Sequence, residues 1–473
     1  MTIKNENKNL WYVIFLSTVA ALGGFLFGYD TAVISGTIST VAAQFSLNNV
    51  STGWYVGCAL VGSIIGVMFA GWLSDTFGRK KTMILSAVLF TLSGVGCAVS
   101  GSFDTLVLYR ILGGVGIGVV SIISPLYISE VSIAEYRGRL VSLYQVAVTV
   151  GFLGAYLVNY GLLQYSHGGA VSIQNETLHK VFASEGWRAM LGMESVPALL
   201  FFIVIFFIPE SPRWLILKQK TANAHFILNR IYGDADEATA QVALTNDAVK
   251  NETKSEWSLL LKPGIRKAVM MGVFIAILGQ FMGVNAVLYY GPTIFEQSGM
   301  SSGDSLFFQV LIGLVNMLTS VLALVIIDKF GRKNLVYYGV SGMILSLVMI
   351  GLYFVKGADF GISPIFLLAF ILLYVFFCAG SICAVIWVLL SEMYPTKVRG
   401  LAMSIAGLSL WIGTYLIGQL TPWMLENLKP ANTFFLFALM CLPYMYIIRF
   451  HIPDTTGKSL EDIEQMWQKD LEK

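Results

Sequence analysis

The 473-residue chain has few charged residues: Asp, Glu, Lys and Arg together make up 12% of it, against 56% hydrophobic residues and a mean hydropathy of +0.72. This balance excludes an ordinary soluble globular protein. The five cysteines show no zinc-site spacing, and the sequence has no nucleotide-binding loop, metal cluster or nucleophile–base pair. We therefore expect buried free thiols rather than disulfides, no metal, no cofactor and no enzymatic activity.

Long apolar runs are what the chain has in abundance. A run of about 20 apolar residues crosses a bilayer as a helix, and twelve such runs follow one another along the sequence. The sequence therefore predicts an all-α membrane protein with twelve transmembrane helices in a lipid bilayer. The expected spans are residues 11–35, 52–73, 82–101, 105–127, 139–163, 187–208, 267–290, 306–327, 333–355, 364–391, 399–422 and 432–451.

Basic residues are unevenly distributed over the turns between these runs. An excess of Lys and Arg on the cytoplasmic side sets the orientation of a membrane protein. A cytoplasmic N-terminus leaves only Lys180, Lys356 and Lys429 in external turns. We therefore expect both termini to be cytoplasmic, with a basic set on the same side: Arg79, Lys80, Lys81, Arg137, Arg139, Arg332, Lys333, Lys397 and Arg399.

Two short motifs occur twice, which indicates two related halves. GWLSDTFGRKK, starting at Gly71, has a counterpart in IIDKFGRKN, and the acid–base pair after the fourth span recurs after the tenth. The repeat predicts six-helix bundles over residues 1–208 and 267–451. Residues 209–266 are polar, and AHFILNRIYG within them has the spacing of an amphipathic helix, so we expect a cytoplasmic helical linker there. Residues 452–473 form the expected cytoplasmic tail.

The repeated motifs place acids and bases at helix ends, where they can pair across neighbouring helices. Such pairs would act as a latch whose breakage shifts the balance between inward-open and outward-open states. For Glu130 with Arg137, and Glu392 with Arg399, the matched charges in both halves favour a latch. For Lys80, Lys81 and Lys333 a role in topology alone stays open. The full predicted set is Asp75, Arg79, Glu130, Arg137, Asp328, Arg332, Glu392 and Arg399.

A series of motifs extends over nearly the whole chain: GYDTAVISG (28–36), GRKK (78–81), YRILGGVGIG (109–118), SPLYISEVSIAEYRGRL (124–140), IPESPRWL (208–215), GQFMGVNAVLYY (279–290), DKFGRK (328–333), WVLLSEMYPTKVRG (387–400) and IPDTTGKSLEDIE (452–464). Through these motifs the chain resembles the sugar porters of the major facilitator superfamily, most of all the bacterial D-xylose–proton symporters. The resemblance implies two pseudo-symmetric six-helix bundles with a midplane site, worked by alternating access.

Sugar binding requires polar groups for the hydroxyls and aromatic surface for the C–H face of the ring. Amides and rings inside the spans supply both, although a membrane Trp also serves packing and an amide can simply bond a neighbouring helix. The family resemblance assigns sugar binding to Phe27, Gln145, Gln280, Asn285, Tyr289, Asn316, Trp387 and Trp411.

The chain departs from the family pattern at several binding positions. Gly279 and Leu410 replace amides, Thr414 stands where Asn is common, and Cys383 and Ala384 replace a Gly-Pro pair. A site that bonds a hydroxyl rejects analogues lacking it, so a changed amide set implies a changed substrate or weaker discrimination. The substrate stays open among hexoses, pentoses and related polyols.

Asp30 lies in the first apolar run and Arg110 in the fourth. Ionisable groups at membrane depth are costly and mark ion or substrate pathways. Helix movement that separates the two would switch Asp30 between protonation states, which is the mechanism of a proton carrier. The resemblance supports this role, because proton-coupled members have Asp at this position. A permanent structural ion pair is the alternative.

Together these features predict a proton-coupled monosaccharide symporter in a bacterial inner membrane, with both termini cytoplasmic. Its expected partners are a small sugar, a proton and the bilayer, with no nucleic acid. A passive sugar uniporter is the first alternative. A non-transporting sugar receptor is the second, and only about 20 residues follow Pro453, which is short for a signalling extension.

Overall fold

The computed structural model describes residues 9–250, 257–357, 359–394, 398–450 and 452 of the chain. These residues contain helices and no strand, and twelve of the helical segments are long and apolar enough to cross a membrane. The predicted all-α class and the count of twelve spans are confirmed. The segments are Leu10–Gly36, Asn49–Phe77, Arg79–Val99, Phe103–Val131, Arg137–His167, Trp187–Phe207, Pro263–Gln297, Ser302–Ile326, Arg332–Lys356, Pro364–Trp387, Arg399–Asn427 and Lys429–Phe450.

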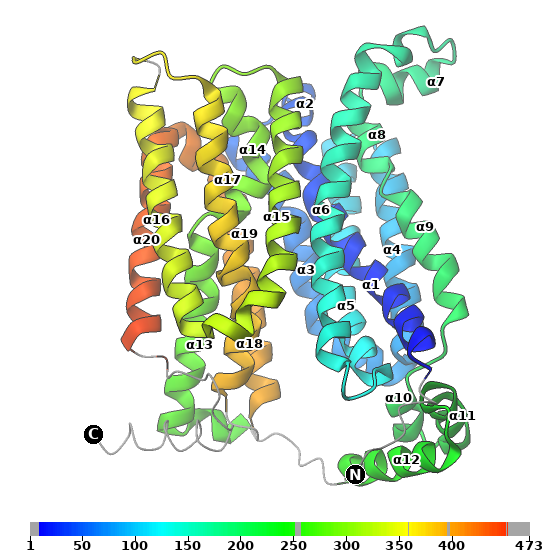
Figure 1. The fold of residues 1–473 in the computed structure, drawn as a ribbon. Helices are drawn as coiled ribbons and strands as arrows, with labels where there is room; N and C mark the ends of the chain where they lie inside the picture. Colours follow the sequence, from blue (N-terminus) through cyan, green and yellow to red (C-terminus); the bar gives the residue numbers. More distant parts are fainter. Residues whose placement is uncertain (1–8, 251–256, 358, 395–397, 451, 453–473) are drawn as a thin grey trace. The chain divides into compact units, whose positions relative to one another are not determined.

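The first twelve helices belong to the N-terminal part of the chain (Figure 1). They are α1 (Leu10–Val33), α2 (Ile38–Gln44), α3 (Asn49–Phe77), α4 (Arg79–Val99), α5 (Phe103–Val131), α6 (Arg137–His167), α7 (Glu176–His179), α8 (Trp187–Gly192), α9 (Ser195–Val204), α10 (Pro212–Leu217), α11 (Thr221–Tyr232) and α12 (Ala235–Lys250).

The remaining helices are α13 (Pro263–Phe281), α14 (Val284–Gln297), α15 (Ser302–Phe330), α16 (Arg332–Lys356), α17 (Pro364–Gly380), α18 (Ile382–Met393), α19 (Arg399–Asn427) and α20 (Lys429–Phe450). Three predicted spans are therefore each built from two helices: α8 with α9, α13 with α14 and α17 with α18.

The chain forms two compact units by packing. Unit 1 comprises Met1–Thr31, Val61–Ala155 and Arg188–Thr253, and unit 2 comprises Ala32–Leu60, Tyr156–Trp187 and Lys254–Lys473. Four of the boundaries fall inside helices, namely α1, α3, α6 and α8. The domain limits drawn from the internal repeat follow the sequence rather than this packing, and they stay a prediction. The predicted tail, 452–473, lies outside the described residues except for Ile452.

In unit 1, close helix packing fixes the position of the first span. A Cβ atom on Gly28 of α1 would collide with the backbone carbonyl of Val148 on α6. Small residues permit this kind of approach between membrane helices, where van der Waals packing supplies the association energy. The approach holds the α1 turn that carries Asp30 against the helices around it.

The predicted amphipathic helix of the linker is confirmed as α11, which ends at Gly233 in the left-handed conformation (φ 67°). Its Ile227 and Ile231 are buried while Phe226 is 64% exposed. The start of α1 is tied to this helix, since Asn9 N donates to the Ile231 carbonyl at 3.0 Å. In Figure 1, α10, α11 and α12 form a small group at the lower end of unit 1.

In unit 2, two spans are interrupted close to each other. Gly283 has φ 90° and separates α13 from α14, and a Cβ there would collide with the Phe437 ring. Ser381 separates α17 from α18. The Tyr374 hydroxyl of α17 donates to the Met282 carbonyl at 2.8 Å, so α17 directly supports the first break. A non-helical backbone carbonyl at membrane depth needs such a partner.

The cysteines match the sequence expectation. All five are free thiols; Cys58, Cys97, Cys378 and Cys441 are buried and Cys383 is half-buried.

Candidate functional site

Asp30 and Arg110 form a buried ion pair in unit 1. The Arg110 Nη1 atom donates to Asp30 Oδ1 at 2.7 Å, and the two side chains are 2% and 0% exposed. A charge placed in such an environment requires a partner and further hydrogen bonds to offset its desolvation. The two residues singled out for coupling from the sequence are therefore brought together by the fold.

Glycine in the fourth span permits close helix packing next to this pair. A Cβ atom on Gly113 of α5 would collide with Ser93 Oγ of α4, whereas its distance of 3.5 Å from Asp30 Oδ1 is ordinary contact. Gly113 is one turn beyond Arg110, and its missing side chain lets α5 approach α4 at Ser93. The Gly-rich stretch YRILGGVGIG thus serves close helix packing, as expected for a membrane helix.

Glu194 is a third member of this cluster, and sequence reasoning missed it. It lies between α8 and α9, is 1% exposed, and interacts electrostatically with both Asp30 and Arg110. Asp30 Oδ2 and Glu194 Oε1 are buried and have no hydrogen-bond partner among the described residues. The signal was present in the sequence, because Glu194 is an acid inside the sixth apolar run.

Arg188, in the sixth span, is also buried but has a different role from Arg110. Arg188 Nη1 donates to the carbonyls of Ala98 at 3.1 Å and Ser100 at 2.6 Å. Cations near a helix C-terminus bond the last carbonyls and interact favourably with the dipole. Arg188 therefore caps α4.

The predicted sugar-binding residues of unit 1 are Phe27 on α1 and Gln145 on α6, and both are half-buried. Phe27 is one turn before Asp30 on the same helix, and its carbonyl accepts a hydrogen bond from the Thr31 hydroxyl at 2.6 Å. The first span thus carries a candidate coupling group and a candidate sugar contact on adjacent turns.

In unit 2, three polar side chains form a cluster next to the break in the seventh span. Asn285 Nδ2 donates to Gln280 Oε1 at 2.7 Å, and the Thr414 hydroxyl of α19 lies 3.1 Å from the same oxygen. Gln280 precedes the break and Asn285 follows it, so the interruption brings both amides to one place. Thr414 participates in this network although sequence comparison with the family marked it as a lost amide.

The other predicted sugar contacts of unit 2 are distributed around α14, α15, α18 and α19. Tyr289, Asn316 and Trp411 are buried, whereas Trp387 is 41% exposed. The Trp387 ring lies 3.6 Å from a Cβ placed on Gly407 of α19. Among the described contacts, none joins Trp387 to the amide cluster, so packing against α19 explains its position.

The first copy of the predicted latch forms a buried network in unit 1. Arg79 Nε and Nη2 donate to the two carboxylate oxygens of Glu130 at 2.9 and 3.0 Å, and Arg79 Nη1 donates to Asp75 at 3.1 Å. The predicted partner of Glu130 is corrected here: it is Arg79 rather than Arg137, whose side chain is exposed. A bidentate Arg–carboxylate pair is geometrically stronger than a single contact.

The segment IPESPRWL completes this network. Glu210 Oε1 accepts bonds from the backbone N–H groups of Arg79 and Lys80 at 2.9 and 3.1 Å and so caps α4. Ser211 donates to Glu130 Oε2 at 2.5 Å, and the Trp214 indole of α10 donates to the Asp75 carbonyl at 3.1 Å. The start of the linker is thereby bound to the ends of α3, α4 and α5.

The second copy of the latch is only partly described. The Asp328 and Glu392 side chains lie outside the described residues. Arg399 donates through Nε and Nη2 to the Tyr394 carbonyl at 3.4 and 3.3 Å. Arg332 begins α16 after Gly331, which has φ 75° as its counterpart Gly78 has φ 98°. The repeated Gly-Arg step therefore has the same left-handed turn in both halves.

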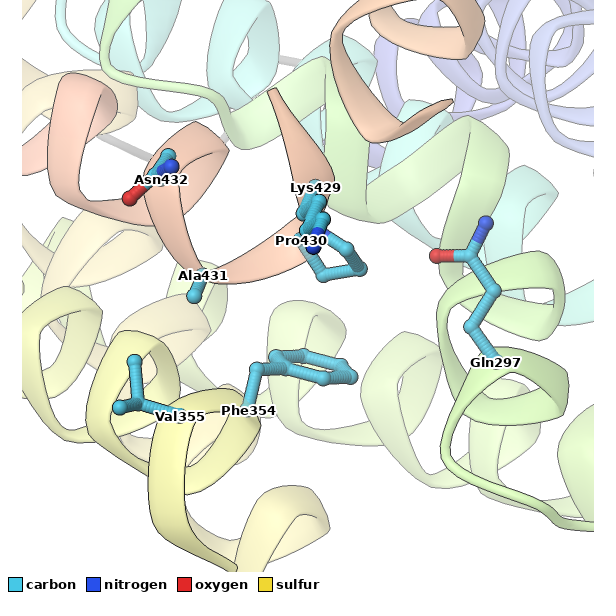
Figure 2. A pocket seen from close by; sticks show the side chains of 7 residues that line it. All are labelled: Gln297, Phe354, Val355, Lys429, Pro430, Ala431 and Asn432. Atoms are coloured by element: carbon cyan, nitrogen blue, oxygen red, sulfur yellow. The ribbon is translucent and has the colours of Figure 1, made fainter. Parts of the chain in front are cut away.

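A cavity of about 490 Å³ lies in unit 2 (Figure 2). None of the predicted sugar-binding residues lines it. It is formed where α14 and α16 end and α20 begins, by Gln297, Phe354, Val355, Lys429, Pro430, Ala431 and Asn432.

Similarity to known proteins extends over almost the whole chain. A family model described as "Sugar (and other) transporter" matches residues 16–467. The arabinose-proton symporter of Bacillus subtilis is 37% identical, covering 98% of this chain and 97% of the relative. The D-xylose-proton symporter of Escherichia coli K12 is 35% identical over 99% and 98%. The inward-open structure of the xylose transporter from E. coli has a TM-score of 0.82 at 34% identity and covers 96% of this chain and 100% of that one.

Proposed function

The chain belongs to the sugar transporter family, and from that premise we propose that it is a proton-coupled monosaccharide symporter. It is a multi-pass membrane transporter and not an enzyme. Three relatives that match nearly its whole length are named as proton symporters of arabinose, D-xylose and galactose, which supports a pentose or hexose as the substrate. We place it in a bacterial inner membrane with both termini cytoplasmic, on the distribution of basic residues.

The observation that carries the coupling proposal is the buried cluster of Asp30, Glu194 and Arg110. Two ionised carboxylates and one guanidinium sum to one negative charge, and one bound proton makes the cluster neutral. A buried net charge is unfavourable, so the cluster can take up one proton. The two buried carboxylate oxygens without partners are the acceptors that remain for it.

Proton binding and helix movement are linked through the ion pair. Protonation of Asp30 removes its charge, which weakens its bond to Arg110 and permits α1 and α5 to separate. In the deprotonated state the bond resists that separation, because each charge would lose its partner in the apolar interior. The loaded carrier therefore reorients with the proton, and the proposed stoichiometry is one proton per sugar.

Sugar binding is assigned to the polar cluster of Gln280 and Asn285 together with the nearby rings. The two amides already contact each other, so their remaining donors and acceptors are held in fixed directions for hydroxyl groups. Tyr289 and Trp411 supply aromatic surface for the ring face. Family membership supports adding Asn316 and Trp387 of unit 2 and Phe27 and Gln145 of unit 1 to this set.

The test is uptake by the wild-type protein in proteoliposomes with an imposed pH gradient. We expect arabinose, xylose, galactose or glucose to accumulate above equilibrium, with proton entry in step, and a protonophore to abolish accumulation. Uptake that only equilibrates would identify the passive uniporter instead. Binding of sugar without any flux would identify the receptor.

A first prediction concerns the latch. Glu130→Gln removes the charge that Arg79 holds through two bonds, so we expect the carrier to shift toward the state in which these helix ends are apart. Cysteine labelling at the ends of α3 and α5 should become faster by roughly fivefold, which corresponds to about 1 kcal/mol. Glu237→Gln, at an exposed position of α12, is the control. Unchanged labelling in Glu130→Gln would limit Glu130 to a structural role.

A second prediction concerns substrate choice at Gly279. A Cβ there would lie 3.5 Å from Ile386 and 3.8 Å from Tyr444, which is ordinary contact, so a side chain can begin at this position. We expect Gly279→Gln to add a hydrogen-bonding group and change the uptake ratio of a sugar to its deoxy analogue by roughly two- to tenfold. Gly279→Ala controls for bulk. An identical ratio in both variants would place position 279 outside the sugar site.

A further inference from the structure

Two cysteines outside the coupling and sugar-binding sets lie on either side of the break in the tenth span. Cys378 is near the end of α17 and Cys383 is the second residue of α18. Their sulfur atoms are 3.6 Å apart, and neither cysteine is in a disulfide. Cys378 is 2% exposed and Cys383 is half-buried. The pair thus lies across the interruption between two helices, and one of its two residues is partly exposed.

Packing fixes the backbone between the two cysteines. The Ser381 hydroxyl between the helices donates to the Phe377 carbonyl at 2.5 Å, and its N–H donates to the Cys378 carbonyl at 3.3 Å. On the neighbouring helix α16, a Cβ on Gly339 would collide with Ser381 Oγ. The break is therefore held against α16, with one cysteine on each side of it.

The spacing suits a shared electrophile better than a direct bond. A disulfide requires sulfur atoms about 2.05 Å apart. Two sulfur atoms bound at about 2.3 Å to one centre lie about 3.3 to 3.8 Å apart for bond angles between about 90° and 109°, and the 3.6 Å that the structure shows falls in this range. The described residues hold no group of three or more His, Cys, Asp or Glu side chains for a metal ion, so a closed four-ligand zinc site is excluded there.

The two cysteines can still bind an electrophilic centre that needs only two thiolate ligands. Trivalent organoarsenicals meet this requirement, since the third valence of arsenic is occupied by the organic group, and thiolates prefer soft centres of this kind. We propose that Cys378 and Cys383 form a dithiol site for a trivalent arsenical, and that bridging the two helices stops transport. With phenylarsine oxide, two As–S bonds form, both thiol protons leave with the arsenical oxygen as water, and no oxidation state changes.

The effect on transport follows from the neighbours of the pair, and this step rests on the proposed sugar symport. Tyr374, one turn before Cys378, bonds the Met282 carbonyl at the break of the seventh span. Gln280 and Asn285 of the sugar-binding cluster flank that break. A bridge from α17 to α18 fixes the angle between them and so restricts the support of the sugar site.

The experiment measures inhibition of sugar counterflow in proteoliposomes by phenylarsine oxide. In the wild type the second As–S bond forms within one molecule, which raises the affinity of the protein for phenylarsine oxide by on the order of a hundredfold. We expect Cys378→Ser and Cys383→Ser each to lower this affinity by the same factor. Cys441→Ser, which replaces a buried thiol of α20, should leave it unchanged. A small dithiol should restore transport while a monothiol should not. Cys378→Ala and Cys383→Ala replace either variant that fails to fold.

Two measurements, the counterflow assay and intact-protein mass spectrometry, separate this proposal from the function it rests on. Mass spectrometry of the purified wild type detects arsenical binding and does not depend on transport. Equal sensitivity of the wild type and both serine variants would overturn the dithiol site. Binding without inhibition would overturn the effect on transport and leave symport standing. The protein could also bind the arsenical across both cysteines and yet move no sugar even before treatment. That result would overturn symport and leave the dithiol site standing.

Discussion

Asp30→Asn is expected to abolish uphill sugar accumulation while leaving sugar exchange intact. A proton crossing 100 mV releases about 2.3 kcal/mol, which corresponds to a roughly forty-fold concentration ratio for a neutral sugar. Asn at this position keeps the size of the side chain and can still accept a bond from Arg110, but its amide does not ionise and so cannot bind and release the coupling proton. Accumulation should therefore fall from tens of fold to unity, with counterflow retained.

The measurement compares accumulation and counterflow of the same radiolabelled sugar in matched vesicles. Asp104→Asn is the control, since Asp104 is an exposed acid in the first turn of α5, the helix that carries Arg110. Accumulation that persists in Asp30→Asn together with proton entry would assign coupling elsewhere, with Glu194 the nearest buried carboxylate. Loss of both accumulation and counterflow would indicate a permanent structural ion pair, the alternative that the sequence leaves open.

The sequence predicted the spans because long apolar runs report membrane burial directly. It did not predict that the sixth, seventh and tenth spans each consist of two helices. Hydropathy is similar on both sides of Gly283 and Ser381, and only the backbone conformation distinguishes the breaks. The sequence therefore predicted one span, 267–290, where the structure has the two helices α13 and α14.

Contacts between candidate site residues were predicted best where charged residues stood out from apolar surroundings. Asp30 and Arg110 were paired correctly since neither is tolerable alone at depth. Glu194 was missed because the sixth run was identified only by its length and hydropathy, and the acid within it was not considered. Thr414 was counted as a lost donor, yet its hydroxyl reaches the oxygen of Gln280. Such compensation depends on which residues face each other, and that information is not local in sequence.

The pairing of Glu130 shows the same limit. Proximity in sequence suggested Arg137, but α5 ends at Val131 and the Arg137 side chain is exposed at the start of α6. Arg79, which is distant in sequence, is brought to Glu130 by the turn at Gly78, whose positive φ directs α4 back along α5. Ion pairs between helices follow from the fold, whereas charge patterns along one segment identify only the candidates.

Arg110→Met is expected to have the largest effect on stability of any substitution considered, at about 3–5 kcal/mol, the usual range when one partner of a buried ion pair is removed. The loss arises because Asp30 and Glu194 would both remain buried with no cation between them. Asp30→Asn removes one of those charges, so the double variant Arg110→Met/Asp30→Asn should recover about 2 kcal/mol. Reversible unfolding in mixed micelles measures the free energy of each variant.

Arg188→Met is the matched control for this cycle, because Arg188 is also a buried arginine but bonds the carbonyls that end α4. Its cost should be independent of Asp30→Asn. If Arg110→Met is rescued no better than Arg188→Met, the Asp30 charge is not what Arg110 compensates, and the cluster cannot hold a proton in the way proposed. Rescue confined to Arg110→Met would show that one positive charge balances this carboxylate. That balance is the condition under which a bound proton weakens the contact between α1 and α5.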